Sequence, residues 1–162
     1  MSRPGLRALA LGSGVIAADQ LSKALVRSGM ARGEEDPIFP GVTLVNTRNR
    51  GVAFGFLENG GAIVAVVTAV ALVALVAFFI VHRRRPLAWL PTGLLLGGAA
   101  GNLIDRVREG AVTDFIDLPA WPAFNLADVA ITFGVLSLLY VLEGPPRAAE
   151  EREREGMPDA VR

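Results

Sequence analysis

The stretch AIVAVVTAVALVALVAFFIV, from Ala62 to Val81, contains 20 consecutive residues without a charge. A second uncharged stretch of 18 residues runs from Leu87 to Ile104. A helix needs roughly 20 apolar residues to cross a hydrocarbon core of about 30 Å. The two stretches therefore predict two membrane-spanning helices, joined by the short turn His82-Arg83-Arg84-Arg85-Pro86.

Two further apolar stretches flank this pair. Residues 6–26 are long enough to span a membrane and carry Asp19 and Lys23 toward their end. In the last stretch, only the 14 residues from Val129 to Leu142 are free of charge, so Asp128 must lie near the interface or face protein if this stretch is to span. We predict four spans, at about 6–26, 61–81, 87–104 and 125–142.

The first stretch has an alternative interpretation as a cleaved secretory signal. Arg3 and Arg7 precede its apolar region, and Ile16-Ala17-Ala18 weakly resembles a cleavage site. Ile16 is not the small residue that such a site needs. The sequence therefore favours a span that ends in polar residues.

The composition limits the chemistry. The chain has 162 residues, of which 52% are hydrophobic and 20% charged, with a mean hydropathy of +0.45. Its 16 basic and 16 acidic residues balance, so no nucleic-acid partner is indicated. Cysteine is absent and His82 is the single histidine, which excludes disulfides, thiol nucleophiles and multi-histidine metal sites. We expect neither a metal nor a cofactor.

The segments between and after the spans set the expected topology. Residues 27–60 and 105–124 are predicted outer loops, and Val42-Thr43-Leu44-Val45 in the first has strand character. The turn at Arg83-Arg84-Arg85 is predicted to be cytoplasmic, as are both termini, which gives nine arginines inside and six outside. Residues 1–142 form one predicted transmembrane domain. Residues 143–162 are predicted to be a disordered, charged cytoplasmic tail.

Ionisable groups in or beside spans are costly and suggest function. In the four-span topology these groups gather toward the outer face with two asparagines: Asp19, Lys23, Asn102, Asp105, Arg106, Asp114, Asn125 and Asp128. Ser22 and Lys23 are adjacent in a helix and point about 100° apart, which argues against a serine-lysine dyad. Two aspartates that share a proton could activate water against an amide. The spacing does not identify which two.

Less specific interpretations stay open for the same residues. Asp19 and Lys23, four apart on a helix, could simply neutralise one another. Asp105 and Arg106 could form an ordinary interfacial ion pair, and Asn125 could cap the fourth helix. Two other functional classes remain: a proton-coupled transporter that relays protons through the intramembrane groups, and a scaffold whose polar groups only hold helices together.

Five segments taken together resemble the lipoprotein signal peptidase (signal peptidase II) family, over about residues 6–142. They are Asp19-Gln20-Leu21-Ser22-Lys23, Arg48-Asn49-Arg50-Gly51-Val52-Ala53-Phe54, Gly101-Asn102-Leu103-Ile104-Asp105-Arg106, Val112-Thr113-Asp114-Phe115 and Phe124-Asn125-Leu126-Ala127-Asp128. Each motif alone is weak, but the five occur in register. One departure is Arg50, where the family commonly has a small or polar residue.

The resemblance implies an all-α polytopic membrane fold of four transmembrane helices, with a small β-like periplasmic cradle from Met30 to Leu57. It implies that Asp114 and Asp128 are the catalytic pair, with Asp114 in a mobile loop that closes onto substrate. It places six residues around substrate or in support of the pair: Asn102, Arg106, Asn125, Asn49, Asp19 and Lys23.

The implied substrate is a bacterial prolipoprotein with a diacylglyceryl cysteine, cut just before that cysteine. The implied location is the bacterial inner membrane, with the active site at the outer face and membrane lipids as the surroundings. We expect a monomeric aspartic endopeptidase.

Overall fold

The computed structural model describes residues 2–50, 61–82, 85 and 87–143. This part of the chain contains four helices and four strands. In chain order they are α1 (Arg3–Gly29), β1 (Glu35–Phe39), β2 (Val42–Asn49), α2 (Gly61–His82), α3 (Trp89–Glu109), β3 (Val112–Leu118), β4 (Trp121–Phe124) and α4 (Leu126–Glu143). The predicted spans at 6–26, 61–81, 87–104 and 125–142 each fall largely within one of these helices.

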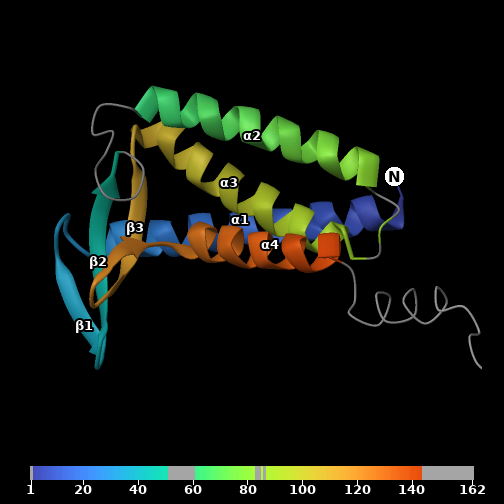
Figure 1. Cartoon of the computed structure of the whole chain (residues 1–162). Helices are drawn as coiled ribbons and strands as arrows, with labels where there is room; N and C mark the ends of the chain where they lie inside the picture. The colour runs from blue at the N-terminus through green and yellow to red at the C-terminus, as the bar shows by residue number, and fades with distance from the viewer. Residues whose placement is uncertain (1, 51–60, 83–84, 86, 144–162) are drawn as a thin grey trace, which may run out of the picture.

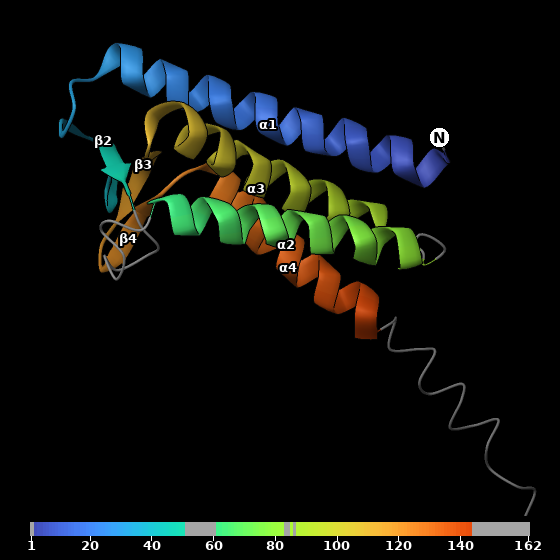
Figure 2. The same ribbon diagram turned by 90° about the horizontal axis from the view of Figure 1, so that it is seen from above.

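The helices lie side by side, and α3 packs against the other three (Figures 1 and 2). Glycines allow the close approach. A Cβ built on Gly97 would lie 2.8 Å from the carbonyl oxygen of Gly12 in α1, and one on Gly98 would lie 2.5 Å from that of Ala127 in α4. Any side chain at these two positions would push the neighbouring helix away.

The third helix is longer than the sequence indicated. It continues past Ile104 to Glu109 and ends at Gly110, whose φ of 68° is the left-handed conformation typical of a helix terminus. Asp105 and Arg106 are therefore helical residues, and the predicted outer loop of 105–124 is wrong at its start. Asp105 is buried against other protein groups there, which the polar composition of this end does not indicate.

The strands form one antiparallel sheet in the order β1-β2-β3-β4, which crosses the ends of α1 and α3 and the start of α4 (Figure 1). The strand character predicted at residues 42–45 is confirmed as part of β2. The rest of the loop 105–124 is mostly strand, because Val112–Leu118 pairs with β2 on one side and β4 on the other. The fold is thus mostly helical with a small sheet, and "all-α" describes it incompletely.

Asp114 lies within β3 with 2% of its surface exposed, so its predicted place in a mobile loop is wrong. Pairing of Asp114 with Thr47 of β2 fixes its backbone.

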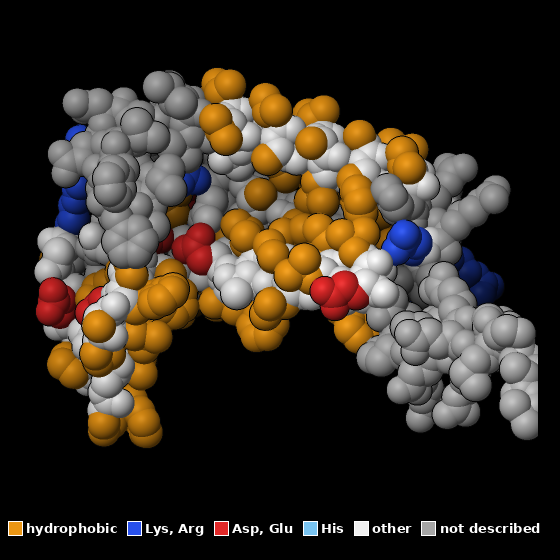
Figure 3. All heavy atoms as spheres, in the orientation of Figure 1, with side chains coloured by type: hydrophobic (Ala, Val, Ile, Leu, Met, Phe, Trp, Pro, Cys, Tyr) orange, Lys and Arg blue, Asp and Glu red, His pale blue; other side chains and the backbone are white. Residues whose placement is uncertain are grey.

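Among the described residues, α1 and α4 are long and apolar enough to cross a membrane by length and composition, and α2 has a shorter apolar segment at Val66–Val81. Figure 3 shows hydrophobic side chains over the helices, with charged side chains toward the two ends. The segment 51–57 of the predicted cradle and the predicted tail lie outside the described residues, apart from Glu143 at the end of α4.

Candidate active site

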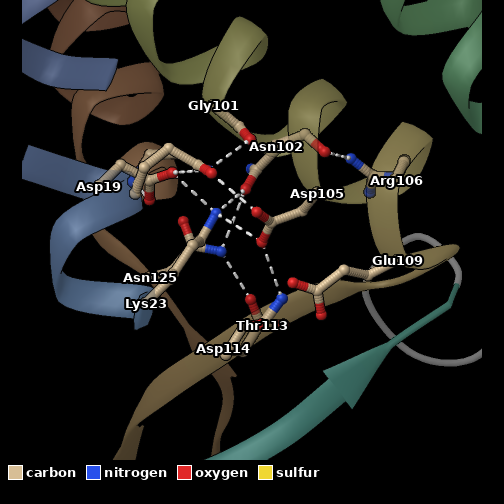
Figure 4. Close-up of polar contacts among 12 residues, drawn as sticks. Asp19, Lys23, Gly101, Asn102, Asp105, Arg106, Glu109, Thr113, Asp114 and Asn125 are labelled. Carbon is tan, nitrogen blue, oxygen red and sulfur yellow. Dashed lines mark hydrogen bonds and ion pairs between the residues drawn. The ribbon is translucent and has the colours of Figure 1, made fainter. Parts of the chain in front are cut away.

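Polar side chains from three helices and two strands meet where the sheet crosses the helix ends (Figure 4). They come from the last turns of α1 and α3, the first turn of α4, and the strands β2 and β3. The alternating directions of the helices bring these distant segments together. The cluster therefore depends on the whole fold.

Asp128 is fixed by the cap of α4. Asn125 is the N-cap residue: its Oδ1 accepts a hydrogen bond from the backbone N–H of Asp128 at 3.1 Å, and Asp128 Oδ2 accepts one from the backbone N–H of Asn125 at 3.1 Å. This reciprocal pair is a capping box with Asp at the third helical position. The cap predicted for Asn125 is confirmed, and it also orients Asp128.

Asp114 faces the same asparagine from β3. Its Oδ1 accepts from Asn125 Nδ2 at 2.6 Å, and its Oδ2 accepts from Asn49 Nδ2 of β2 at 3.1 Å. The pKa of Asp114 is raised from 3.8 to about 6; burial is the main cause and the nearby Asp128 adds to it, whereas hydrogen bonds from Asn49 and Asn125 and the charge of Lys23 lower the pKa. Asp114 can therefore bind a proton closer to neutral pH than an exposed aspartate can.

Asn102 of α3 connects this pair to α1. Its Nδ2 donates to Asp128 Oδ1 at 2.9 Å, and its Oδ1 accepts from Lys23 Nζ at 2.9 Å and from Asn125 Nδ2 at 3.2 Å. The amides of Asn102 and Asn125 thus join the two carboxylates in one continuous hydrogen-bond network. Such a network restrains both aspartates together.

Beneath the asparagines lies a fully buried ion cluster. Lys23 Nζ is 2.8 Å from Asp19 Oδ2 and 3.2 Å from Asp105 Oδ2, and none of the three side chains is more than 2% exposed. The predicted Asp19–Lys23 pairing is confirmed. The interfacial Asp105–Arg106 pair is not what forms, because Asp105 points inward to Lys23. Asp19 also accepts from the backbone N–H of Ala127 at 3.0 Å, which ties α1 to the first turn of α4.

The number of donors distinguishes the four carboxylates. A carboxylate can accept about four hydrogen bonds. Asp19 accepts from Gln20, Lys23 and Ala127, and Asp105 accepts from Gln20, Lys23 and Thr113. Asp114 and Asp128 each accept from two donors among the described residues. Asp114 and Asp128 therefore retain the greater capacity to bind a further donor.

Arg106 lies at the edge of the cluster, half-buried, with one Nη donating to the backbone oxygen of Asn102 at 3.4 Å. Its Nε is buried and makes no hydrogen bond to the part of the chain that the structure describes. The guanidinium thus lies beside the two carboxylates with one donor that no described residue uses.

Comparisons with known proteins identify the family of this chain. The family model for "Signal peptidase (SPase) II" matches residues 11–143, which include every residue of the cluster. The chain belongs to the signal peptidase II family. It is 46% identical over 143 residues to the lipoprotein signal peptidase of Moorella thermoacetica, covering 87% of this chain and 93% of that protein. It is 38% identical to the lipoprotein signal peptidase of Pelotomaculum thermopropionicum, covering 87% and 94%.

Two solved structures share the fold of this signal peptidase II chain. Both are bacterial membrane enzymes determined by the in meso method. The first has a TM-score of 0.77 at 29% identity and covers 96% of this chain and 94% of its own. The second has a TM-score of 0.73 at 32% identity, with coverage of 83% and 91%. The membrane nature predicted from the apolar stretches is therefore confirmed.

All eight predicted site residues of this signal peptidase II lie in or beside the network. They are Asp19, Lys23, Asn49, Asn102, Arg106, Asp114, Asn125 and Asp128. The sequence did not indicate that Gln20 and Thr113 take part, or that Asp105 points inward to them. Gln20 was visible in the first motif, one residue from Asp19. The contact of Thr113 with Asp105 depends on β3, a strand in a segment where the sequence predicted a loop.

Proposed function

We propose that this chain is an aspartic endopeptidase that removes the signal peptide from diacylglyceryl-modified bacterial prolipoproteins, with Asp114 and Asp128 as the catalytic pair. The observation that carries the proposal is the bridge through Asn125, which donates its amide to Asp114 and its backbone N–H to Asp128. One residue thus holds both carboxylates at one site. The name of the relatives, lipoprotein signal peptidase, supports the substrate.

In the proposed mechanism the pair shares one proton. Burial raises the pKa of Asp114 to about 6, which suits it to hold that proton and give it to the leaving amine. Asp128, half-buried and hydrogen-bonded by Asn102 and by the N–H of Asn125, takes a proton from the attacking water. The donor counts above support these two residues over Asp19 and Asp105. The mechanism needs neither a metal nor a cofactor.

Arg106 and Asn49 are proposed to hold the substrate or support the pair. The positive charge of Arg106, which lies near both carboxylates, would stabilise a peptide carbonyl oxygen that gains negative charge during the reaction. Asn49 already donates to Asp114 and sits at the end of β2, where a peptide could approach. Support for the pair is also proposed for the buried residues of α1 and α3. Lys23 holds Asn102, which donates to Asp128, and Asp19 holds the start of α4 through the backbone of Ala127.

We further propose that all four helices cross the bacterial inner membrane as a monomer, with both termini in the cytoplasm. The positively charged turn 82–86 then lies inside, and the sheet and active site lie at the outer face. Exposed apolar side chains along α1 and α4, such as Leu9, Leu21 and Leu136, would contact membrane lipids. Diacylglyceryl chains would reach the site from the bilayer while the peptide bond stays at the interface.

The test is cleavage of a synthetic lipopeptide and of the same peptide without lipid by purified protein in detergent. The parental protein is expected to cut only the lipidated peptide, just before the cysteine. Asp114→Asn and Asp128→Asn are each expected to lower kcat by about 10²–10⁴-fold, the usual contribution of an acid or base, while the protein stays folded. Parental activity in either variant would show that the pair is wrongly assigned.

Asp117→Asn is the matched control. It makes the same change on the same strand, three residues beyond Asp114, at a side chain that is only half-buried. We expect parental cleavage from this variant.

A further inference from the structure

Asp105 is a buried carboxylate for which the proposed reaction has no direct use. We propose that Asp105 is a positioning residue that holds β3 through the backbone of Thr113 and thereby sets the place of Asp114. The inference rests on the proposed function, since it concerns the geometry of the proposed catalytic pair. Asp105 itself, 2% exposed and bonded to three donors, is not the acid or the base.

The strand needs an anchor at this point. Thr113 pairs with Arg48 of β2 on one side, whereas β4 pairs with β3 only at Ile116 and Leu118. On its other side, the backbone N–H of Thr113 donates to Asp105 Oδ2 at 3.1 Å. Asp105 of α3 therefore takes the place of a neighbouring strand where β4 does not reach. Because Thr113 directly precedes Asp114, this bond fixes the peptide from which the Asp114 side chain extends.

The side chain of Thr113 is held as well. Its Oγ1 accepts from Arg27 at 3.2 Å and from Arg48 at 2.9 Å, and Thr113 is fully buried. Both arginines also contact Glu109, one turn beyond Asp105 on α3. The last two turns of α3 thus contact Thr113 in two ways: directly through Asp105, and indirectly through Glu109 and the two arginines. Figure 4 shows Asp105, Glu109 and Thr113 together.

Only an acceptor fits at position 105. The groups around its oxygens are all donors: the Thr113 N–H, the Lys23 ammonium and the Gln20 amide at 2.9 Å, with the Arg27 guanidinium at 3.9 Å. An asparagine would turn its own NH₂ toward one of these donors and leave a buried donor unpaired. Lys23 also donates to Asn102, which orients Asp128, so a disturbance at Asp105 reaches both carboxylates.

The experiment compares Asp105→Asn with Glu109→Gln in full-length protein purified in detergent. The first readout is kcat and KM on the lipopeptide. The second is hydrogen–deuterium exchange of the backbone in residues 111–118, which does not depend on activity. For Asp105→Asn we expect kcat to fall by about 10²-fold, the effect of roughly an ångström of misplacement, with KM little changed. Exchange at Thr113 is expected to accelerate by at least about tenfold.

Glu109→Gln is the graded comparison, because this side chain is 32% exposed and acts only through the arginines. We expect kcat to fall by about two- to fivefold. Asp105→Glu keeps a carboxylate and, unlike asparagine, introduces no N–H group. It is the variant to measure if Asp105→Asn does not fold. Its kcat is expected to fall below the parental value by less than about 10²-fold, with faster exchange at Thr113.

Three results would overturn the inference. They are unchanged exchange at Thr113 in Asp105→Asn, a raised KM with parental kcat, and a loss of activity that only tracks the loss of folded protein. A parental protein that does not cleave the lipopeptide is a different failure: it removes the proposed function, while exchange still reports whether Asp105 anchors β3.

Discussion

Replacing Asn125 with serine separates two roles of this side chain at the start of α4. Serine is a good N-cap, so its hydroxyl can still accept from the backbone N–H of Asp128. Serine is one bond too short to replace the amide that donates to Asp114 at 2.6 Å and to Asn102 at 3.2 Å. The backbone N–H of residue 125 still donates to Asp128. The substitution therefore releases Asp114 and leaves the helix cap in place.

The magnitudes follow from these contacts. The hydrogen bond to a charged carboxylate contributes about 1.5–3 kcal/mol to folding, and both Asn125→Ser and Asn125→Ala lose it. Asn125→Ala also loses the cap, which is worth about 1 kcal/mol. We expect the two variants to differ by about 1 kcal/mol in stability but to show the same loss of kcat, about 10²-fold, because both leave Asp114 free to move.

The assay is lipopeptide cleavage with kcat and KM measured separately, beside thermal unfolding in the same detergent. Asn46→Ser is the matched control. Asn46 is 4% exposed on β2, and its amide donates to the backbone oxygen of Met30, away from the aspartates. It should lose stability and keep kcat. Parental kcat in Asn125→Ser, or an equal loss of kcat in Asn46→Ser, would refute the role given to the Asn125 bridge.

Two further predictions concern stability, measured by thermal unfolding in detergent. Asp114→Asn is expected to stabilise the protein at pH 7. Burial raises the folded-state pKa of this carboxyl from 3.8 to about 6, so an ionised Asp114 costs about 3 kcal/mol of folding free energy at this pH. The substitution removes that cost but also loses one hydrogen bond, which is worth about 1 kcal/mol. The gain should disappear as the pH falls from 6 toward 4, and a gain that persists at pH 4 contradicts the assignment. Gly98→Ala is expected to destabilise by about 1–3 kcal/mol, because its Cβ would lie 2.5 Å from the backbone oxygen of Ala127. Gly14→Ala, whose Cβ would meet nothing within 4 Å, should instead stabilise α1 by up to about 1 kcal/mol, and equal effects of the two would show that α3 does not pack tightly on α4.

The helices were predictable because apolar runs in this sequence are long and uninterrupted. The run from Ala62 to Val81 coincides with most of α2, which spans Gly61–His82. The prediction failed where a helix continues in polar residues. Asp105 is buried against other protein groups although Val107 beyond it is exposed, and hydropathy carries no signal for such a buried carboxylate near the end of a helix.

The second half of the sheet was missed for a different reason. Val112-Thr113-Asp114-Phe115-Ile116 is rich in residues that favour strands, but it contains an aspartate and lies between two helices. Its strand is defined by pairing with β2, more than 60 residues away in sequence, as in the Thr113–Arg48 pair. Pairing at such a distance is not encoded in local composition, so the sequence alone predicts a loop for this segment.

The sequence could not identify which two of the four aspartates form the proposed catalytic pair, because all four lie near the same end of the helices. What separates them is the number of donors that each one meets, and this depends on side chains from other elements. Asp19 and Asp105 are each bonded to three donors and form ion pairs with Lys23, so they connect the helices to one another and to β3. Among the described residues, Asp114 and Asp128 meet two donors each, and three of those four donors belong to Asn102 and Asn125, counting the backbone N–H of Asn125. Amides donate without adding a charge, so they hold the two carboxylates in place without neutralising either one, which is what the proposed sharing of one proton requires.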